Sequence, residues 1–303
     1  MNRFYSNGKL LLSGEYLILD GASGLALPTR LGQEMIVSTG DDHSRLSWKS
    51  LDKNGVIWFE VQFSLPKLEL MNFKGSESVA LTLQRILRKT QKANASFLRS
   101  SEGIQVTTKL QFERNWGLGS SSTLINNIAQ WSETDAFDLL FSSFGGSGYD
   151  IACAGIDRPL IYTLDHGKPH YETVTFDPSF KEQLYFVHLN RKQISSDSIK
   201  QYKKKKVPKG TIKIITDISK NLLSAPTIED FNKLLKEHEL IMADILETET
   251  IQQKLFPDFQ GQLKSLGAWG GDFILASGDP STMAYFQKKG FQTVVPYQSM
   301  IKS

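Results

Sequence analysis

The stretch Trp116-Gly117-Leu118-Gly119-Ser120-Ser121-Ser122-Thr123 follows an alternating, strand-like segment (103–112) and leads into a segment of helical pattern (123–131). Glycines let the backbone adopt positive φ and approach a ligand closely, and the N–H groups at a helix N-terminus favour an anion. Hydroxyl groups at the same place can bond a phosphate or ligate Mg²⁺. The stretch is therefore consistent with a phosphate-binding turn and equally with a plain loop that ends in a serine N-cap.

The signatures of other nucleotide-binding classes are absent from the sequence. No Gly-Lys-Ser or Gly-Lys-Thr follows the glycines, as it does in a Walker P-loop. No Gly-x-Gly-x-x-Gly fingerprint opens the chain, and the protein-kinase signatures Val-Ala-Ile-Lys and His-Arg-Asp are missing. The turn at 117–122 thus belongs to none of these three classes.

Two further glycine-rich segments and one N-terminal segment carry polar groups of interest. Asp150 directly follows the turn 145–148 and is placed to receive a hydroxyl proton, or alternatively to interact with a helix dipole. The segment 267–272 precedes a buried-type strand and allows close approach to a ligand, or alternatively forms a simple bulge. Lys9 and Glu15 interrupt an otherwise apolar run, and Lys9 is expected either to pair with Asp150 or a phosphate, or to lie on the surface.

These four segments, in this order, resemble the motifs of the GHMP kinases (galactokinase, homoserine kinase, mevalonate kinase and phosphomevalonate kinase). The first motif resembles Asn7-Gly8-Lys9 to Gly14-Glu15-Tyr16, continuing to Gly24-Leu25-Ala26-Leu27-Pro28. The second resembles Gly117-Leu118-Gly119-Ser120-Ser121, the catalytic-aspartate segment Ser147 to Ala152, and the third motif Gly267 to Asp272. The resemblance spans nearly the whole chain, and the second motif is its most specific part.

The resemblance implies an α+β fold of two domains. The N-terminal domain, residues 1–172, would be similar to domain 2 of ribosomal protein S5, and the C-terminal domain, residues 173–303, would be ferredoxin-like. A break in the pattern at 165–180, where His166-Gly167-Lys168-Pro169 and Asp177-Pro178 occur, supports a boundary there. ATP and Mg²⁺ are the expected cofactors, and the acceptor is expected to meet ATP between the domains.

The resemblance also implies roles for individual residues. Asp150 would be the catalytic base or would orient the acceptor hydroxyl, and Lys9 would stabilise Asp150 or the transferred phosphoryl group. The phosphates would be held by the cofactor-binding residues Gly117, Leu118, Gly119, Ser120, Ser121 and Ser122, and Ser121 would ligate Mg²⁺. The expected substrate contacts are Glu15, Arg191, Lys192, Ser195, Ser196, Gly267 and Trp269. Arg191 and Lys192 would meet a carboxylate or phosphate, or alternatively lie in a solvated loop.

Finer details of the motifs bear on the identity of the acceptor. Gly14-Glu15-Tyr16 and the third motif are more similar to those of phosphomevalonate kinase than to those of galactokinase, which favours mevalonate or phosphomevalonate. The chain departs from the family pattern in three ways. Ser121 and Asp150 lie only 29 positions apart, which is shorter than is usual in mevalonate kinases. None of Glu133, Asp135 and Asp138 matches the acidic Mg²⁺ ligand of mevalonate kinase, and Trp269 replaces a glycine of the third motif. The alternatives are a non-catalytic nucleotide or metabolite sensor, a related ATP-dependent decarboxylase, and an RNA-binding protein.

Composition limits these alternatives. The 303 residues suffice for two domains, and a net charge of +3 suits anionic small molecules better than nucleic acid, despite the lysine run 203–206. Cys153 is the only cysteine, so no internal disulfide can form, which favours a reducing compartment, the cytoplasm. The apolar runs are short, so no membrane partner is expected. A monomer or homodimer is expected.

Periodicity and turn residues predict the order of elements. Asn54-Gly55 predicts the turn of a hairpin spanning 46–63, and the stripe of Val79, Leu83, Ile86 and Leu87 predicts a helix over 76–94. The other strands are expected at 9–19, 33–39, 103–112, 159–164, 184–189, 273–276 and 291–296. The other helices are expected at 123–131, 135–144, 196–206, 210–223, 227–247 and 280–289.

Overall fold

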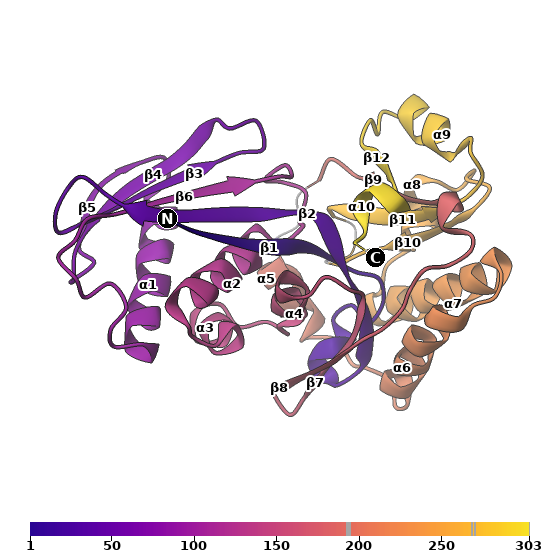
Figure 1. Cartoon of the computed structure of the whole chain (residues 1–303). Helices are drawn as coiled ribbons and strands as arrows, with labels where there is room; N and C mark the ends of the chain where they lie inside the picture. The colour runs from indigo at the N-terminus through magenta and orange to yellow at the C-terminus, as the bar shows by residue number, and fades with distance from the viewer. Residues whose placement is uncertain (192–194, 268, 270, 303) are drawn as a thin grey trace. The chain divides into compact units, whose positions relative to one another are not determined.

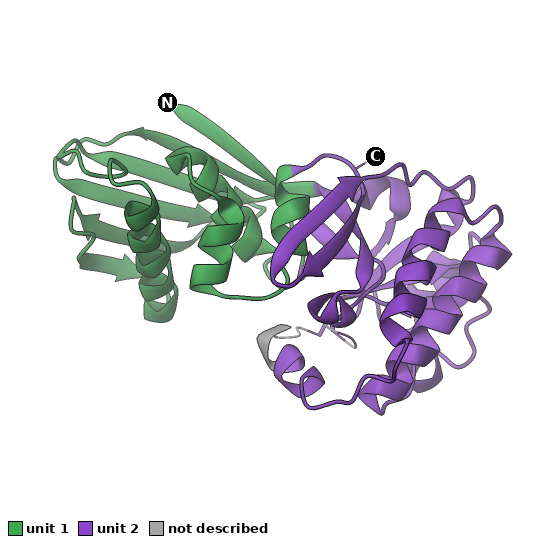
Figure 2. Ribbon diagram, turned by 90° about the horizontal axis from the view of Figure 1, so that it is seen from below, with its two compact units in different colours: residues 1–8, 31–114, 118–155 green, residues 9–30, 115–117, 156–303 purple. Residues whose placement is uncertain are grey.

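The computed structural model of the protein describes residues 1–191, 195–267, 269 and 271–302, with only the backbone of 195–197. The chain forms two compact units (Figure 2): residues 1–8, 31–114 and 118–155 make up unit 1, and residues 9–30, 115–117 and 156–303 make up unit 2. Both units are discontinuous in sequence, because β1 (Asn2–Leu11) and β2 (Ser23–Thr39) each contribute residues to both. The domain boundary at 172/173 remains a prediction.

The sheet of unit 1 has the strand order β5-β4-β3-β6-β2, formed by β3 (Arg45–Leu51), β4 (Ile57–Ser64), β5 (Leu70–Lys74), β6 (Ile104–Leu110) and the C-terminal part of β2. β3 and β6 are parallel, and the other pairs are antiparallel. The predicted hairpin is confirmed: Gly55 has φ of 83°, and the Asp52 carboxylate accepts hydrogen bonds from the backbone N–H groups of Asn54 and Val56.

Four helices cover one face of this sheet (Figure 1): α1 (Glu77–Ala93), α2 (Ser120–Ser132), α3 (Ala136–Ser143) and α4 (Tyr149–Gly155). In α1 the buried residues Ala80, Leu83 and Leu87 recur every three to four positions, which directs one stripe toward the sheet. They pack against sheet residues such as Trp48 and Phe59 in one apolar core. The predicted helix over 76–94 is confirmed.

Unit 2 is built around a four-stranded antiparallel sheet of order β10-β11-β9-β12. Its strands are β9 (Leu184–His188), β10 (Gln262–Ser265), β11 (Phe273–Ser277) and β12 (Val294–Pro296). All residues of β9 and β11 are buried. A second antiparallel group joins the N-terminal part of β2 to β7 (Leu160–Asp165) and β8 (Lys168–Thr173).

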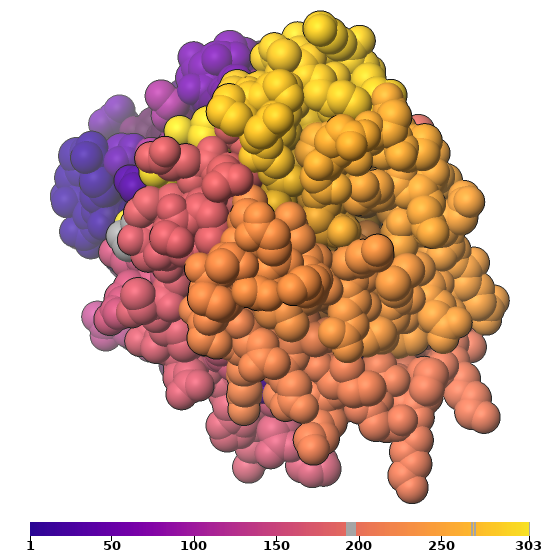
Figure 3. Space-filling model, turned by 90° about the vertical axis from the view of Figure 1, so that its right-hand side faces the viewer, coloured from indigo at the N-terminus to yellow at the C-terminus, as the bar shows by residue number. Residues whose placement is uncertain are grey.

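The helices of unit 2 belong mainly to the C-terminal half of the chain, whose side chains form most of the face in Figure 3. The long α7 (Ile228–Leu246) packs against β10 and against α6 (Thr211–Asn221). The shorter helices are η1 (Leu17–Asp20), η2 (Lys181–Gln183), α5 (Ser195–Tyr202), η3 (Leu222–Ser224), α8 (Ile251–Leu255), α9 (Thr282–Lys288) and α10 (Tyr297–Met300). Within the described residues, no helix combines the length and apolarity that crossing a membrane requires.

The overall α+β class is confirmed: β1 to β8 form one large mixed sheet, in which β1 also pairs with β2, and β9 to β12 form a smaller sheet. Several elements nevertheless differ from expectation. The strand expected at 9–19 is wrong beyond Leu11: the chain turns there, with φ of 89° at Gly14 and 58° at Tyr16, and continues into η1. The elements β5, β8, β10, α4, α8 and α10 were not predicted. Each of them has seven residues or fewer, too short for periodicity to identify.

Candidate active site

The glycine-serine turn opens α2, as the sequence predicted. Gly119 is the N-cap residue with φ of 89°, and Gly117 also has positive φ, 65°. Ser120 is half-buried and Ser121 is exposed in the first helical turn. Because the first N–H groups of a helix lack intrahelical partners, this turn presents backbone donors and the exposed hydroxyl of Ser121 in one place.

The other polar residues of the turn hold it in place. The Ser122 hydroxyl is buried and donates to the backbone oxygen of Gly119 at 2.9 Å. The Thr123 hydroxyl lies 2.9 Å from Oε1 of Gln33, to which it donates, and so ties α2 to β2. The Leu118 side chain is completely buried. Leu118 and Ser122 can therefore contribute backbone groups to a ligand, whereas Ser121 can contribute its side chain.

Asp150 lies in the first turn of α4 and is half-buried. Its Oδ1 accepts a hydrogen bond from the backbone N–H of Ile151 at 3.1 Å. Gly148, with φ of 89°, provides the bend that precedes the helix. Since α4 packs against α2, Asp150 and the serines of the turn belong to neighbouring helices of unit 1. Lys9 is half-buried on the part of β1 that belongs to unit 2.

Within unit 2, the start of the turn meets the end of the third motif. A Cβ atom placed on Gly117 would overlap the Asp272 carboxylate, so only glycine fits there without displacement. The Trp116 ring packs edge-on against Phe273, with ring centroids 5.5 Å apart. Asp272 was not among the predicted site residues, although its position directly after the paired glycines was a usable signal.

Substitution of Gly117 by Ala is expected to destabilise the protein more than the same change at Gly145. Both glycines have similar positive φ, 65° and 73°, so both variants bear a backbone cost of about 1–2 kcal/mol. A Cβ on Gly145 would meet no atom within 4 Å, whereas that on Gly117 displaces Asp272, which adds about 1–3 kcal/mol. Equilibrium unfolding in denaturant measures the difference; equal losses for the two variants would contradict the contact with Asp272.

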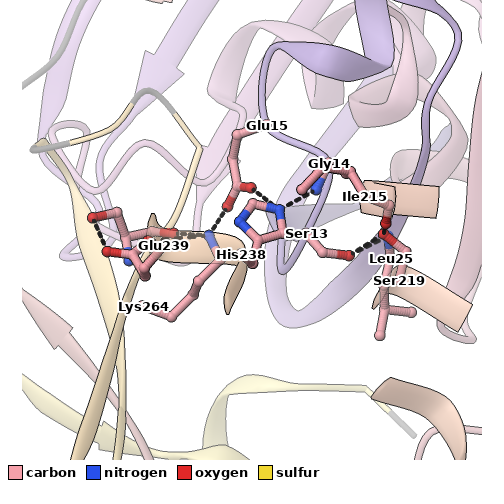
Figure 4. A network of polar contacts seen from close by, with 10 residues as sticks. Ser13, Gly14, Glu15, Leu25, Ile215, Ser219, His238, Glu239 and Lys264 are labelled. Atoms are coloured by element: carbon pink, nitrogen blue, oxygen red, sulfur yellow. Dashed lines mark hydrogen bonds and ion pairs between the residues drawn. The ribbon is translucent and has the colours of Figure 1, made fainter. Parts of the chain in front are cut away.

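Glu15 lies in a buried polar network of unit 2 (Figure 4). Its Oε1 accepts from Lys264 Nζ at 2.5 Å, and its Oε2 lies 3.2 Å from His238 Nε2. Lys264 Nζ also donates to the backbone oxygen of Ser265 at 2.6 Å and lies 3.5 Å from Glu239 Oε1. The side chains of Glu15, His238 and Lys264 have no exposed surface. Glu15 thus contacts protein groups rather than a solvent-accessible pocket.

The network holds two carboxyl groups and one ammonium group. If both carboxyls were ionised, a net negative charge would be buried, which is costly. Burial raises the pKa of Glu15 to about 7, although Lys264 acts in the opposite direction. Burial also raises the pKa of Glu239. The pair of carboxyl groups is therefore expected to retain a proton as the pH approaches neutrality.

His238 is the neutral member of this network. Its Nε2 accepts a hydrogen bond from the Gly14 backbone N–H at 3.0 Å, which places the ring proton on Nδ1. Burial, and then the positive charge of Lys264, hold the pKa of His238 well below its usual value. Nε2 also faces Glu15 Oε2. Two acceptor atoms in contact repel each other, and a proton on the Glu15 carboxyl removes this repulsion.

The partners of Glu15 were missed in the sequence, although a signal existed. His238 and Glu239 lie on the buried stripe of α7 together with Leu235 and Met242. Two ionisable residues at core positions of a helix indicate a buried partner. Lys264, in the short strand β10, is that partner.

The other residues that were predicted to contact substrate differ in their exposure. Arg191 is exposed, and Gly267 and Trp269 are half-buried in unit 2, Gly267 with φ of 61°. Ser195 and Ser196 begin α5, where only the backbone is described. Lys192 lies outside the described residues. The roles of these residues remain predictions.

The donor set of unit 1 fits Mg²⁺ bound together with a triphosphate. Among the described residues, no group of three or more His, Cys, Asp and Glu side chains is placed to hold a metal ion. Mg²⁺ usually takes only one or two protein oxygens and completes its shell with phosphate and water. The exposed Ser121 hydroxyl and the Asp150 carboxylate are oxygen donors of this kind.

Comparison with known proteins identifies the fold. No family model matches the chain, and no curated protein sequence matches it. The structure is similar to that of Streptococcus pneumoniae phosphomevalonate kinase in complex with phosphomevalonate and AMPPNP (TM-score 0.69, 17% identity, 95% of this chain and 96% of that chain). Lactococcus lactis galactokinase complexed with galactose (0.69, 12%, 99% and 95%) and Methanococcus jannaschii mevalonate kinase (0.67, 13%, 95% and 94%) are also similar. Over nearly its whole length, the chain therefore has the fold of the GHMP kinases.

Proposed function

We propose that the protein is an ATP-dependent small-molecule kinase that transfers the γ-phosphate of Mg-ATP to a hydroxyl or phosphate group of a small acidic metabolite. The observation that carries this proposal is the glycine-serine turn at the N-terminus of α2, with Gly119 in the left-handed region and Ser121 exposed. In a chain with the fold of three kinases that differ in acceptor, this turn is suited to a triphosphate.

The residues of the chain bind and orient more than they react. Backbone N–H groups of 117–122 hold the phosphate oxygens, and Ser121 supplies an oxygen ligand to the metal. Mg²⁺, when bound, neutralises charge that develops on the phosphates. Asp150 orients the acceptor hydroxyl and takes its proton, and Lys9 stabilises Asp150 or the transferred phosphoryl group. Alignment of the acceptor with phosphorus is then the main contribution to rate.

Mevalonate or phosphomevalonate is the acceptor that we favour. The support is the resemblance of Gly14-Glu15-Tyr16 and of 267–272 to the phosphomevalonate kinase motifs, together with the fold of the phosphomevalonate kinase structure. Because the galactokinase structure has the same fold at similar TM-score, a sugar is the alternative acceptor. A cytoplasmic protein acting as a monomer or homodimer is part of the same proposal.

ADP release from Mg-ATP tests the proposal directly. The acceptors are mevalonate, phosphomevalonate, homoserine and galactose, with a reaction without acceptor as the control. We expect release that depends on mevalonate or phosphomevalonate. Release with galactose or homoserine alone would support the proposed kinase activity but contradict the proposed acceptor. Tight ATP binding without release would favour a nucleotide sensor, an outcome for which the bulky Trp269 in the third motif gives a reason. Absence of ATP binding would contradict the proposal.

A further inference from the structure

Lys264 is a fully buried cation that joins two segments distant in sequence. Its ammonium lies between the carboxylates of Glu15, from the first motif, and Glu239, from α7 (Figure 4). Removing a lysine from water is costly, and an apolar residue of similar volume often serves a core equally well. A buried lysine with two carboxylate partners therefore points to a need for defined geometry rather than for stability alone.

One end of the network holds the turn of the first motif. The Glu15 carboxylate is bound by Lys264, and the Gly14 backbone N–H donates to His238 on α7. The Ser13 hydroxyl donates to Ser219 on α6 at 2.8 Å. A Cβ on Gly14 would lie 2.8 Å from the Cα of Gly24, so the turn also packs tightly against β2. The turn is thus held from several sides within unit 2.

The other end of the network holds the strand that leads into the third motif. Glu239 Oε1 accepts from the Ser265 backbone N–H at 2.9 Å, and Glu239 Oε2 lies 3.3 Å from the Ser265 hydroxyl. Lys264 Nζ donates to the Ser265 backbone oxygen. Both backbone groups of Ser265 are therefore bound by the network, two residues before Gly267, where the third motif begins.

We propose that Lys264 is a positioning residue. It holds the turn of the first motif at a fixed position relative to β10, the strand that leads into the third motif. Glu15 then acts through Lys264 and does not contact substrate. The role rests on the proposed kinase function, because it is in that reaction that both motifs are proposed to take part. His238 and Glu239 assist Lys264, because His238 accepts from the Gly14 N–H and Glu239 accepts from the Ser265 N–H.

Amide hydrogen exchange read by mass spectrometry tests the coupling without any substrate. In Lys264→Met, exchange is expected to rise at least tenfold in both 12–18 and 262–267, since the one cation holds both segments. His238→Leu removes only the acceptor of Gly14 N–H and is the second variant if Lys264→Met does not fold. It is expected to raise exchange in 262–267 as well, by way of Glu15 and Lys264. Lys289→Met, which removes an exposed lysine paired with Asp258, is the control.

Steady-state kinetics with the acceptor that supports ADP release tests the role in the reaction. We expect Lys264→Met to lower kcat about a hundredfold, as misplacement of reacting groups does, with KM for ATP nearly unchanged. Glu15→Gln keeps an oxygen for Lys264 and lets Glu239 be its charged partner. This conservative variant is therefore expected to retain kcat within about threefold.

Three results would overturn the inference. Faster exchange in only one of the two segments would show that Lys264 does not couple them. A loss of kcat in Glu15→Gln as large as that in Lys264→Met would indicate that Glu15 contacts substrate itself. Normal kcat in a folded Lys264→Met protein would exclude a positioning role. If none of the acceptors supports ADP release by the wild type, the kinase proposal fails by itself. The exchange data still decide whether the two segments are coupled.

Discussion

Asp150→Asn is expected to lower the turnover of the proposed kinase reaction on the order of a hundredfold or more, the usual contribution of a positioned acid or base. Asparagine preserves the size of the side chain and an oxygen that can accept from the Ile151 N–H, so α4 should form as in the wild type. What it loses is the negative charge that takes the proton of the acceptor hydroxyl. Single-turnover ADP formation at saturating substrates measures the loss in the chemical step.

Asp138→Asn is a matched control for this experiment. Asp138 is an exposed acid in the first turn of α3, as Asp150 is an acid in the first turn of α4, and both helices belong to unit 1. The control removes the same charge from the first turn of a helix, so it shows how much of any loss comes from the helix dipole. Equal turnover in the two variants and the wild type would refute the role of Asp150.

Lys264→Met is expected to lower the free energy of unfolding by about 3–5 kcal/mol at neutral pH, because it leaves two buried carboxyl groups without their cation. The loss should be smaller at pH 5, where both carboxyl groups can be protonated in the folded state. Methionine approximates the length of the lysine chain, which limits the contribution of a cavity. Denaturant unfolding at pH 5 and pH 7.5 measures both values; a loss that does not depend on pH would argue for packing alone.

The pH dependence of the wild type follows from the same network. The pKa of Glu15 is raised from 4.5 to about 7 in the folded protein, so between these values the folded state binds a proton that the unfolded state has released. The contribution of Glu15 to stability is therefore fully present below pH 4.5 and is lost as the pH rises through 7. Lys264, His238 and Glu239 face Glu15, and the lowered pKa of His238 acts in the opposite direction.

Comparison with Glu15→Gln isolates this contribution. The difference in free energy of unfolding, wild type minus variant, is expected to fall steadily between pH 4.5 and pH 7 and to level off above it, because the glutamine does not titrate. Asp230, Asp258 and Asp279 have lowered pKa values, so their effects occur at more acidic pH. A difference that stays constant over this interval would mean that Glu15 is held ionised by Lys264, because a lowered pKa would place the change below pH 4.5.

Local patterns in the sequence determined much of the first unit. Asn54-Gly55 predicted the hairpin of β3 and β4, because few dipeptides accept the positive φ that such a turn needs. The apolar stripe of α1 and the glycines that open α2 were likewise readable, since each depends on residues close together in the chain. The α+β class followed from the order of these elements and from the resemblance of the motifs.

Only the tertiary structure decided which buried charges meet. Glu15 was expected to contact substrate, and its partners Lys264 and His238 are more than 200 positions away, on β10 and α7. The division into units was equally hidden, because β1 and β2 contribute to both and no single cut of the chain reproduces it. Periodicity and turn chemistry act over a few residues, whereas the pairing of buried ions is set by which segments the fold brings together, and no local pattern encodes that.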